Sequence, residues 1–129
     1  MINIGTYLKI ADNSGGLFAK CIGVSRISYN LTIPGHIITV VIQRIIYKKN
    51  IVKKSKIISK GMICKALILR TKKGLRRWGN FFVRSINNRI ILINNFFVPY
   101  GTRFFGTFFR ELRTDLRFKR LVSVAQYTI

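Results

Sequence analysis

Apolar residues follow two different spacings along this chain, and the change between them divides it. Over the first two-thirds, short stretches alternate apolar with polar residues or are apolar throughout, and turn-forming residues separate them. This pattern predicts strands at Thr6–Ile10, Leu17–Ser25, His36–Ile46 and Met62–Arg70. The last of these is apolar on both faces, which is typical of a closed barrel whose outside is covered by another part of the chain.

Two further segments complete the β region. We expect a hairpin between Phe81–Ser85 and Arg89–Ile93, because Asn87 and Asn88 between them tolerate a left-handed backbone. The stretch Lys48–Lys60 is rich in lysine and has few turn-forming residues, and we expect an exposed basic hairpin or loop there.

After Pro99 the apolar period lengthens to between three and four, which predicts helix. One face would carry Phe105, Phe109, Leu112 and Leu116, and another would carry Arg110, Arg113, Arg117 and Arg120. Thr114-Asp115 would cap and divide the region into two short α-helices. We therefore expect a single, mainly β domain over residues 1–129. Residues 1–100 would form a small OB- or SH3-like barrel of five or six strands, and 101–129 a turn and the two helices.

Charge narrows the possible partners. The 129 residues hold 24 Lys and Arg against three Asp and Glu, a formal charge of +21, in a chain that is also 49% hydrophobic. Disordered basic tails lack such apolar content, so the chain is expected to fold and to be neutralised by a polyanion. Nucleic acid is the leading candidate, since cations placed on phosphates release condensed counterions. A membrane surface comes second and acidic proteins third.

One basic segment is dense enough to single out. From Arg70 to Trp78 five cations fall at the end of the apolar strand, and Gly74 lets the backbone turn so that they fan out from one point. Trp78 would stack on a base or plug the barrel end. The pairs Phe104-Phe105 and Phe108-Phe109 offer a stacking platform too, but their helical spacing favours packing in the core.

Enzymatic chemistry is poorly supplied. General acid–base catalysis would have to use Asp12, Glu111, Asp115 or His36, and we expect these acids to form caps and salt bridges. Cys21, Cys64 and His36 lack the spacing of a zinc site, so no metal or cofactor is expected and both thiols should be buried, reduced and structural. Ile37–Ile46 is too short and too polar to span a bilayer, so no membrane partner is expected. Because catalytic residues are lacking, no small-molecule substrate is expected either.

Three blocks also resemble a known family. They are Leu8–Gly15 with Cys21-Ile22, Lys65–Arg77, and Gly101–Gly106 continuing into Arg110–Arg113. In order and spacing they resemble the L-fourteen family of universal large-subunit ribosomal proteins over essentially the whole chain. The resemblance implies a five-stranded barrel with carboxy-terminal helices and a non-enzymatic role in holding large-subunit ribosomal RNA.

The resemblance also implies neighbours. It places the protein at the face that meets the small subunit, beside the ribosomal protein of the L-nineteen family, in an intersubunit bridge with small-subunit RNA. Thr102 and Arg103 would then face that boundary and the ribosomal silencing factor; the alternative is that Arg103 pairs with Glu111 and caps the barrel. RNA contacts are expected at Asn13, Ser14, Lys53, Lys54, Arg70, Lys72, Lys73, Arg76, Arg77, Arg110, Arg113, Arg117 and Arg120.

Departures from the family pattern bear on the source. His36 and Met62 stand where relatives usually carry carboxylates, and Trp78-Gly79-Asn80 stands where they often show Pro-Asp-Gly. With a composition rich in Ile, Asn, Lys, Phe and Tyr and no import signal expected, this favours a mitochondrially encoded protein of the matrix. The cytoplasm of an AT-rich bacterium or a plastid stroma is the alternative location. The alternative function is a free-standing barrel that binds single-stranded nucleic acid.

Overall fold

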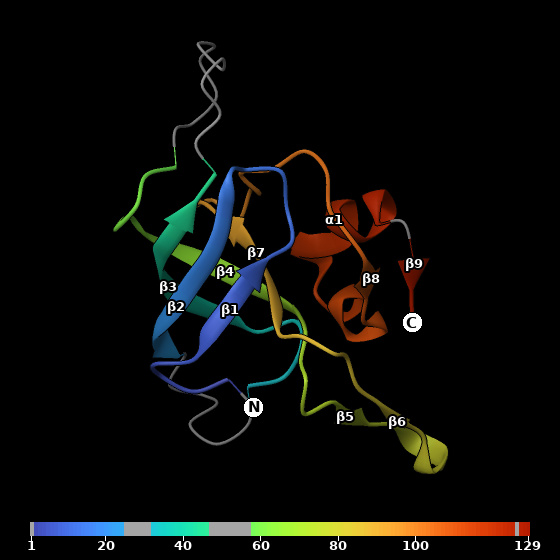
Figure 1. Ribbon diagram of the computed structural model, residues 1–129. Coiled ribbons are helices and arrows are strands. Elements are labelled where there is room, and N and C mark those ends of the chain that lie inside the picture. Colours follow the sequence, from blue (N-terminus) through green and yellow to red (C-terminus); the bar gives the residue numbers. More distant parts are fainter. Residues whose placement is uncertain (1, 25–31, 47–57, 126) are drawn as a thin grey trace.

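The computed structural model describes residues 2–24, 32–46, 58–125 and 127–129. Lys53, Lys54 and most of the predicted basic loop Lys48–Lys60 therefore lie outside the described residues. Five strands form a closed barrel (Figure 1), namely β1 (Tyr7–Ile10), β2 (Gly16–Val24), β3 (Ile37–Ile45), β4 (Ile63–Arg70) and β7 (Arg89–Ile93).

The order around the barrel is β1-β2-β3-β4-β7. All neighbouring strands are antiparallel except β1 and β7, whose parallel pairing of Ile10 with Ile90 closes the barrel. The predicted mainly β fold with a five-stranded barrel is confirmed. All five barrel strands follow their predicted bounds within one residue over the described part of the chain, and β7 matches the predicted Arg89–Ile93 at both ends.

Alternate residues of each strand fill the barrel. Leu8 and Ile10 of β1, Val40 and Ile42 of β3, and Ile68 of β4 are buried in one cluster with Ile90 and Leu92 of β7. Cys21 and Cys64 belong to the same cluster and are free thiols, as predicted. Their role is that of small apolar side chains.

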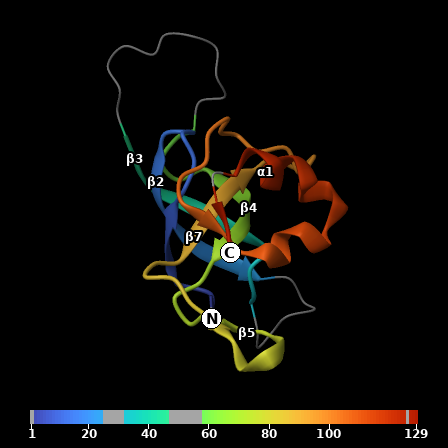
Figure 2. The same cartoon turned by 90° about the vertical axis from the view of Figure 1, so that its right-hand side faces the viewer.

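A second cluster lies outside the barrel, where the carboxy-terminal segment covers β4 and β7 (Figure 2). Leu67, Leu69, Ile91 and Ile93 point outward and are buried against Phe104, Phe108, Phe109, Leu112 and Phe118. The prediction that the barrel is covered on its outside is thus confirmed. Phe105 is the exception among the paired phenylalanines, since it is exposed.

The prediction of two α-helices in the carboxy-terminal segment is wrong. The segment forms two 3-10 turns, η3 (Arg110–Thr114) and η4 (Leu116–Phe118), and one α-helix, α1 (Lys119–Val124). The cap was placed correctly, because the Asp115 carboxylate accepts from the Arg117 backbone N–H. Leu116 is exposed and does not share an apolar face with Leu112. A 3-10 helix has about three residues per turn and not 3.6, so side chains four residues apart point in different directions there.

The predicted hairpin around Asn87-Asn88 is also wrong. Strand β6 (Phe82–Val83) pairs with β5 (Leu75–Arg76) around the turn η2 (Trp78–Asn80), while β7 enters the barrel between β4 and β1. Ile90 to Ile93 are all buried, which an isolated two-stranded hairpin cannot achieve. A hairpin does exist, at Leu75–Val83, and it projects away from the barrel (Figure 1).

The last strands tie the carboxy-terminal segment together. β8 (Thr107–Phe108) pairs in parallel with β9 (Tyr127–Thr128). The backbone N–H of Ile129 donates to the Phe108 carbonyl, and that of Arg110 donates to the Ile129 carbonyl, both at 2.8 Å. Within the described ranges, no helix has the length and apolar character needed to cross a membrane.

Candidate nucleic-acid interface

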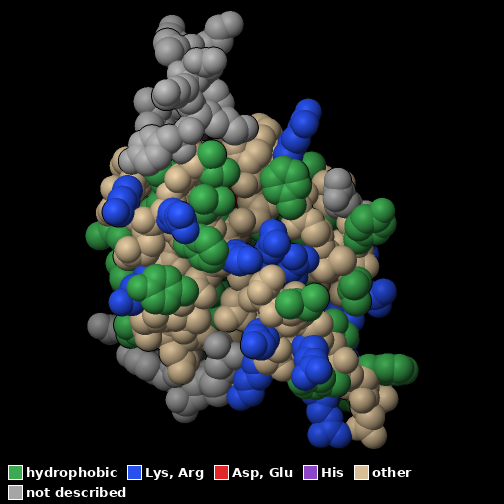
Figure 3. All heavy atoms as spheres, viewed as in Figure 1, with side chains coloured by type: hydrophobic (Ala, Val, Ile, Leu, Met, Phe, Trp, Pro, Cys, Tyr) green, Lys and Arg blue, Asp and Glu red, His purple; other side chains and the backbone are tan. Residues whose placement is uncertain are grey.

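All three acidic side chains of the sequence are engaged inside the protein. Asp12 is buried, Glu111 is paired with Arg77, and Asp115 is paired with Arg117. Among the described residues, the remaining Lys and Arg form no ion pair with a carboxylate. Figure 3 shows basic side chains spread over one face and on towards the projecting hairpin, with no acidic side chain visible between them. The surface is therefore positive without local neutralisation.

The loop after β4 carries the densest part of this charge. Thr71 is buried and its carbonyl accepts from the Ser85 N–H, while the Lys72 N–H donates to Asn88 Oδ1 at 2.7 Å. These bonds hold the backbone, and both Lys72 and Lys73 extend into solvent. Asn88, predicted as a hairpin turn residue, instead supports the basic loop.

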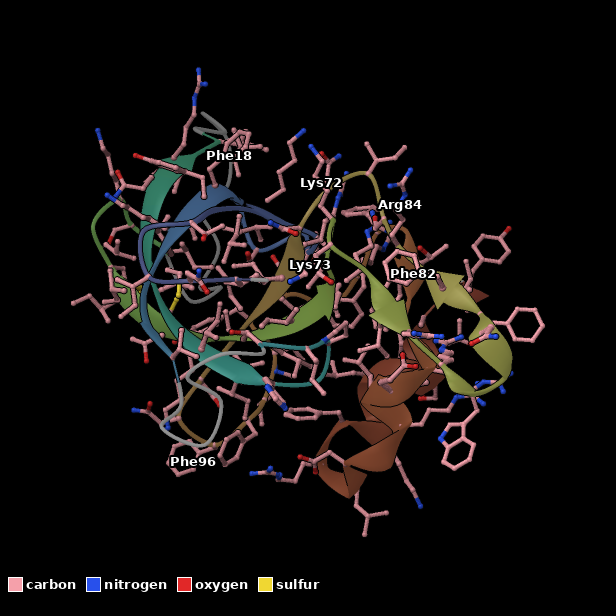
Figure 4. All side chains as sticks on the ribbon, turned by 90° about the horizontal axis from the view of Figure 1, so that it is seen from below. Phe18, Lys72, Lys73, Phe82, Arg84 and Phe96 are labelled. Atoms are coloured by element: carbon pink, nitrogen blue, oxygen red, sulfur yellow. The ribbon has the colours of Figure 1, made fainter. Side chains whose placement is uncertain are left out.

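A surface cavity of about 370 Å³ opens beside this loop. Lys72, Arg84, Ser85 and Ile86 line it, so cations from both sides of the hairpin base face one space. Figure 4 shows Lys72 and Arg84 near the point where the hairpin leaves the barrel, and Arg84 and Phe82 both approach Gly74 there. The cavity combines positive charge with a hydroxyl and an apolar wall, a lining suited to a phosphate and its sugar.

Two arginines lie side by side at the rim of the barrel. Arg70 of β4 pairs in register with Arg89 of β7, and the Nε atom of each is buried without a partner among the described residues. Arg70 Nη1 donates to the carbonyl and the hydroxyl of Thr107 at 3.1 and 2.9 Å. Burial, with the charge of Arg89, lowers the pKa of Arg70 from its ordinary value. Two adjacent guanidinium groups with no acid between them favour an anionic ligand.

The next two arginines of the predicted loop have intramolecular partners. Arg77 binds Glu111 through two nitrogens and also donates to the Ile129 carbonyl at 2.7 Å. Arg76 is exposed, and its Nη2 donates to Asn80 Oδ1 at 2.6 Å. Arg77 therefore fastens the hairpin to the carboxy-terminal segment, while Arg76 remains accessible along one edge of it.

The turn Asp12–Gly15 joins the turn at Thr102 and Arg103. Asn13 Oδ1 accepts from the backbone N–H groups of Thr102 and Arg103 at 2.8 and 3.1 Å, and Asn13 Nδ2 donates to Thr102 Oγ1. Ser14 turns inward and donates to the Asp12 carboxylate through its N–H and its hydroxyl. The structure thus brings four of the predicted site residues into one small surface.

Asp12 organises that surface from beneath. Its second oxygen accepts from the Leu92 N–H at 3.0 Å, which links the turn to β7. Burial raises the pKa of Asp12, and the hydrogen bonds from Ser14 and Leu92 only partly offset this. The two neighbouring turns are consequently held on a buried carboxylate and expose the side chains of Asn13, Thr102 and Arg103.

The predicted arginine stripe is divided. Arg110 and Arg113 are exposed, the latter donating to Thr128 Oγ1 at 3.2 Å. Arg117 is bound by Asp115 and lies 4.7 Å from the centre of the Phe97 ring. The Arg120 side chain lies outside the described part of the structure. Only Arg110 and Arg113 of the four are therefore seen as exposed cations free of an ion pair.

Arg84 and Arg89 were not among the residues predicted from the sequence. Each becomes a candidate only through its partner, Arg84 across the cavity from Lys72 and Arg89 in register with Arg70. The mistaken hairpin between 81–85 and 89–93 concealed both relations. Trp78, for which plugging the barrel was one prediction, is 98% exposed, so that alternative is wrong.

Other chemistry finds no site in the described part of the chain. No group of three or more His, Cys, Asp or Glu residues comes together to hold a metal ion there. Cys21 and Cys64 share the barrel core, and burial lowers the pKa of His36. The candidate interface therefore consists of basic side chains around hydrogen-bonded turns.

Comparison with known proteins decides the family. The family model described as Ribosomal protein L14p/L23e matches residues 1–129. This chain belongs to that family. The uL14m large ribosomal subunit protein of Acanthamoeba castellanii is 50% identical to it over 133 aligned positions, covering all of both chains. That of Acanthamoeba polyphaga is 52% identical over 120, covering 90% of this chain and all of its own.

A bacterial relative is also similar. The uL14 protein of Carsonella ruddii is 38% identical over 133 aligned positions and covers both chains completely. The L14p/L23e membership identifies this chain as a ribosomal protein with a structural role and not an enzyme. The resemblance drawn from the three sequence blocks is therefore confirmed.

Proposed function

We propose that this L14p/L23e protein is a constituent of the large subunit of a mitochondrial ribosome, where it holds large-subunit RNA. The observation that carries the proposal is that all three acids are engaged internally while the cations of the loop and hairpin lie on the surface. A protein with this charge gains free energy from every phosphate that it neutralises. RNA is the polyanion that a ribosome supplies.

Within that interface the loop residues have different roles. Three cations are exposed and would bind phosphates directly, namely Lys72, Lys73 and Arg76. Arg70 and Arg89 would offer a fixed pair of guanidinium groups. Arg84 joins Lys72 at the cavity. Arg77 acts through the hairpin that it anchors. Asn13, Ser14, Arg110 and Arg113 would extend the RNA contacts, together with Lys53, Lys54, Arg117 and Arg120.

The turn at Thr102 and Arg103 would face the small subunit. Its two side chains are exposed, and Asn13 holds the turn through both backbone N–H groups as well as through Thr102 Oγ1, so the side chains can meet a partner while the backbone bonds keep the turn in place. Following the family resemblance, the partners there are small-subunit RNA, the L-nineteen family protein and the ribosomal silencing factor.

The mitochondrial assignment rests on the relatives' names. Two of the similar proteins are called uL14m, in which the suffix denotes the mitochondrial ribosome. The departures from the family pattern and the AT-biased composition support a gene in the organelle itself. We also treat residues 1–129 as one domain, since the carboxy-terminal segment shares a buried cluster with β4 and β7.

Sedimentation of the native particle tests the proposal. In a mitochondrial lysate the protein should travel with the large subunit at moderate salt and be released only at high salt, because its binding is electrostatic. A crosslink from Lys72 or Lys73 to large-subunit RNA would locate the interface. Recovery of the protein only in free nucleic-acid complexes, away from the subunit, would instead support the single-strand-binding alternative.

A further inference from the structure

The tip of the β5–β6 hairpin exposes three aromatic side chains. Trp78 is 98% exposed, Phe81 71% and Phe82 58%. Three exposed aromatic side chains within five residues, on an element that projects from the barrel, form a candidate binding surface. The three aromatic side chains lie next to the basic residues of the candidate interface but are themselves uncharged.

The hairpin presents these rings on a defined backbone. Gly79 and Asn80 both take left-handed conformations, with φ of 79° and 62°, and the Arg77 N–H closes the turn on the Phe81 carbonyl at 2.8 Å. Below the tip, Gly74 approaches the Val83 carbonyl so closely that an added Cβ would lie 2.5 Å from it. The Arg77 pair with Glu111 then fixes the stem to the rest of the protein.

The surroundings of the tip select the kind of partner. Arg76 lies on the same hairpin, and Lys72 and Arg84 line the cavity at its base. Glu111 is the acid bound to this hairpin in the described structure, and Arg77 already neutralises it. Exposed rings bordered by unpaired cations match a ligand with both flat apolar surfaces and phosphates.

We propose that this hairpin binds unpaired nucleotides of RNA, with a base stacked on Trp78, further stacking on Phe81 and Phe82, and the neighbouring phosphates on Arg76, Lys72 and Arg84. The inference rests on the proposed function and narrows it from RNA in general to unstacked bases at one element. Aromatic side chains bind bases in this way with little sequence preference, since every base has a π face.

Trp78 is the sole tryptophan of the chain, so its fluorescence reports on the tip alone. The full-length protein is titrated with a single-stranded oligouridine and with an RNA duplex of the same length at low salt. Both should bind, but the single strand should quench and shift the tryptophan emission more strongly, because paired bases are not free to stack. Equal quenching by the two RNAs would overturn the inference.

Substitutions give the second arm of the test. Trp78→Ala should weaken single-strand binding about 5- to 150-fold, the equivalent of about 1–3 kcal/mol for one stacked base, and leave duplex binding and the salt slope unchanged. Trp78→Phe should retain most of the affinity. Phe81→Ala should weaken binding, whereas the control Phe96→Ala, at a phenylalanine that is at least as exposed (85% against 71%) but far from the hairpin in Figure 4, should not.

Each remaining outcome has one meaning. If Trp78→Ala and Phe81→Ala bind single strands as well as Phe96→Ala does, the tip does not stack on bases. If RNA leaves the emission unchanged but purified large-subunit proteins shift it, the hairpin is a protein-docking element and the inference is wrong. If the unsubstituted protein binds neither RNA at low salt, the proposed function itself fails, and this inference fails with it.

Discussion

Arg77 donates two hydrogen bonds to the carboxylate of Glu111, from Nε to Oε1 at 2.6 Å and from Nη2 to Oε2 at 2.9 Å. The pair joins the projecting hairpin, at the residue that precedes its turn Trp78–Asn80, to the turn η3. Each side chain is about three-quarters buried, at 24% and 23% exposure. The alternative in which Arg103 pairs with Glu111 is therefore wrong. Arg77, predicted from the sequence to contact RNA, thus also has a structural partner within the protein.

Glu111→Gln should destabilise the protein in a pH-dependent way. Burial alone raises the pKa of Glu111, but hydrogen bonds from Arg77 and the backbone, with the charges of Arg77 and Arg110, outweigh it and leave the pKa below its ordinary value. The stabilisation is thus present above the unfolded pKa of about 4.3 and is lost as pH falls through the lower folded value. We expect a loss of about 1–2 kcal/mol at pH 7.

Thermal melts across that range provide the check. The difference in melting temperature between the unsubstituted protein and Glu111→Gln should shrink as pH drops below about 4.3. Asp115→Asn breaks the more exposed pair with Arg117 and should have a smaller effect at pH 7. A difference that stayed constant down to strongly acid pH would show that the ion pair is not its cause.

Gly74→Ala should destabilise the hairpin more than Gly61→Ala does. Both glycines have a left-handed backbone, at φ of 80° and 82°, so each substitution carries about 1–2 kcal/mol of backbone strain. Only at Gly74 would the new Cβ meet backbone, 2.5 Å from the Val83 carbonyl, whereas nothing lies within 4 Å at Gly61. Denaturant unfolding measures both losses, and equal values would contradict the close approach at Gly74.

Cys64 should resist alkylation in the native protein. Burial, with the nearby charge of Asp12, raises the pKa of its thiol to about 11. At pH 8 the reactive thiolate would then be at least about 100-fold scarcer than for an exposed cysteine of pKa about 8.5. Iodoacetamide labelling followed by mass spectrometry should modify Cys64 only after unfolding. Rapid modification of the folded protein would show that the barrel core is open to the reagent.

Replacing Lys72, Lys73 and Arg76 together with Gln should flatten the salt dependence of RNA binding. Three phosphate contacts correspond to a change of about 2 to 3 in the log–log slope, using the coefficients for single strands and duplexes. The three side chains are exposed and outside ion pairs in the described structure, so the melting temperature should stay nearly unchanged. A fall in melting temperature with an unaltered slope would assign these residues to the fold.

The role of the Thr102 and Arg103 side chains in binding a partner should be separable from the folding of the turn that carries them. Changing both to Ala removes two exposed side chains and the bond from Asn13 Nδ2 to Thr102 Oγ1, but it keeps the two backbone N–H groups that donate to Asn13 Oδ1. Large-subunit assembly should therefore persist while subunit joining or silencing-factor binding weakens. Asn13→Ala removes that acceptor and should disturb assembly as well. Gradient profiles of ribosomal particles distinguish the two, and loss of assembly in the double variant would make the turn a folding element.

The strands of the barrel and its covered outer face could be predicted from the sequence, because both depend on local spacing. Alternating residues such as Val40 and Ile42 must point to one side of a strand, and a run such as Ala66–Leu69 must be buried on both. Charge is likewise a property of composition. The preference for a polyanion needed no coordinates, since three acids cannot neutralise 24 cations wherever they lie.

The choice of strand partners, and with it most of the candidate site, was decided by the tertiary structure. Residues 81–93 contain two strands and a plausible turn, yet β7 does not pair with β6, because Ile90–Ile93 bury far more apolar surface when β7 is a barrel strand. Ile90 and Leu92 then lie inside the barrel, and Ile91 and Ile93 lie beneath the carboxy-terminal segment. That choice of partners brings Arg89 to Arg70 and frees β6 to pair with β5, which places Arg84 beside Lys72 and lifts Trp78 into solvent. Sequence spacing determines which faces of an element are apolar, but the partner of each face depends on burial summed over the whole chain.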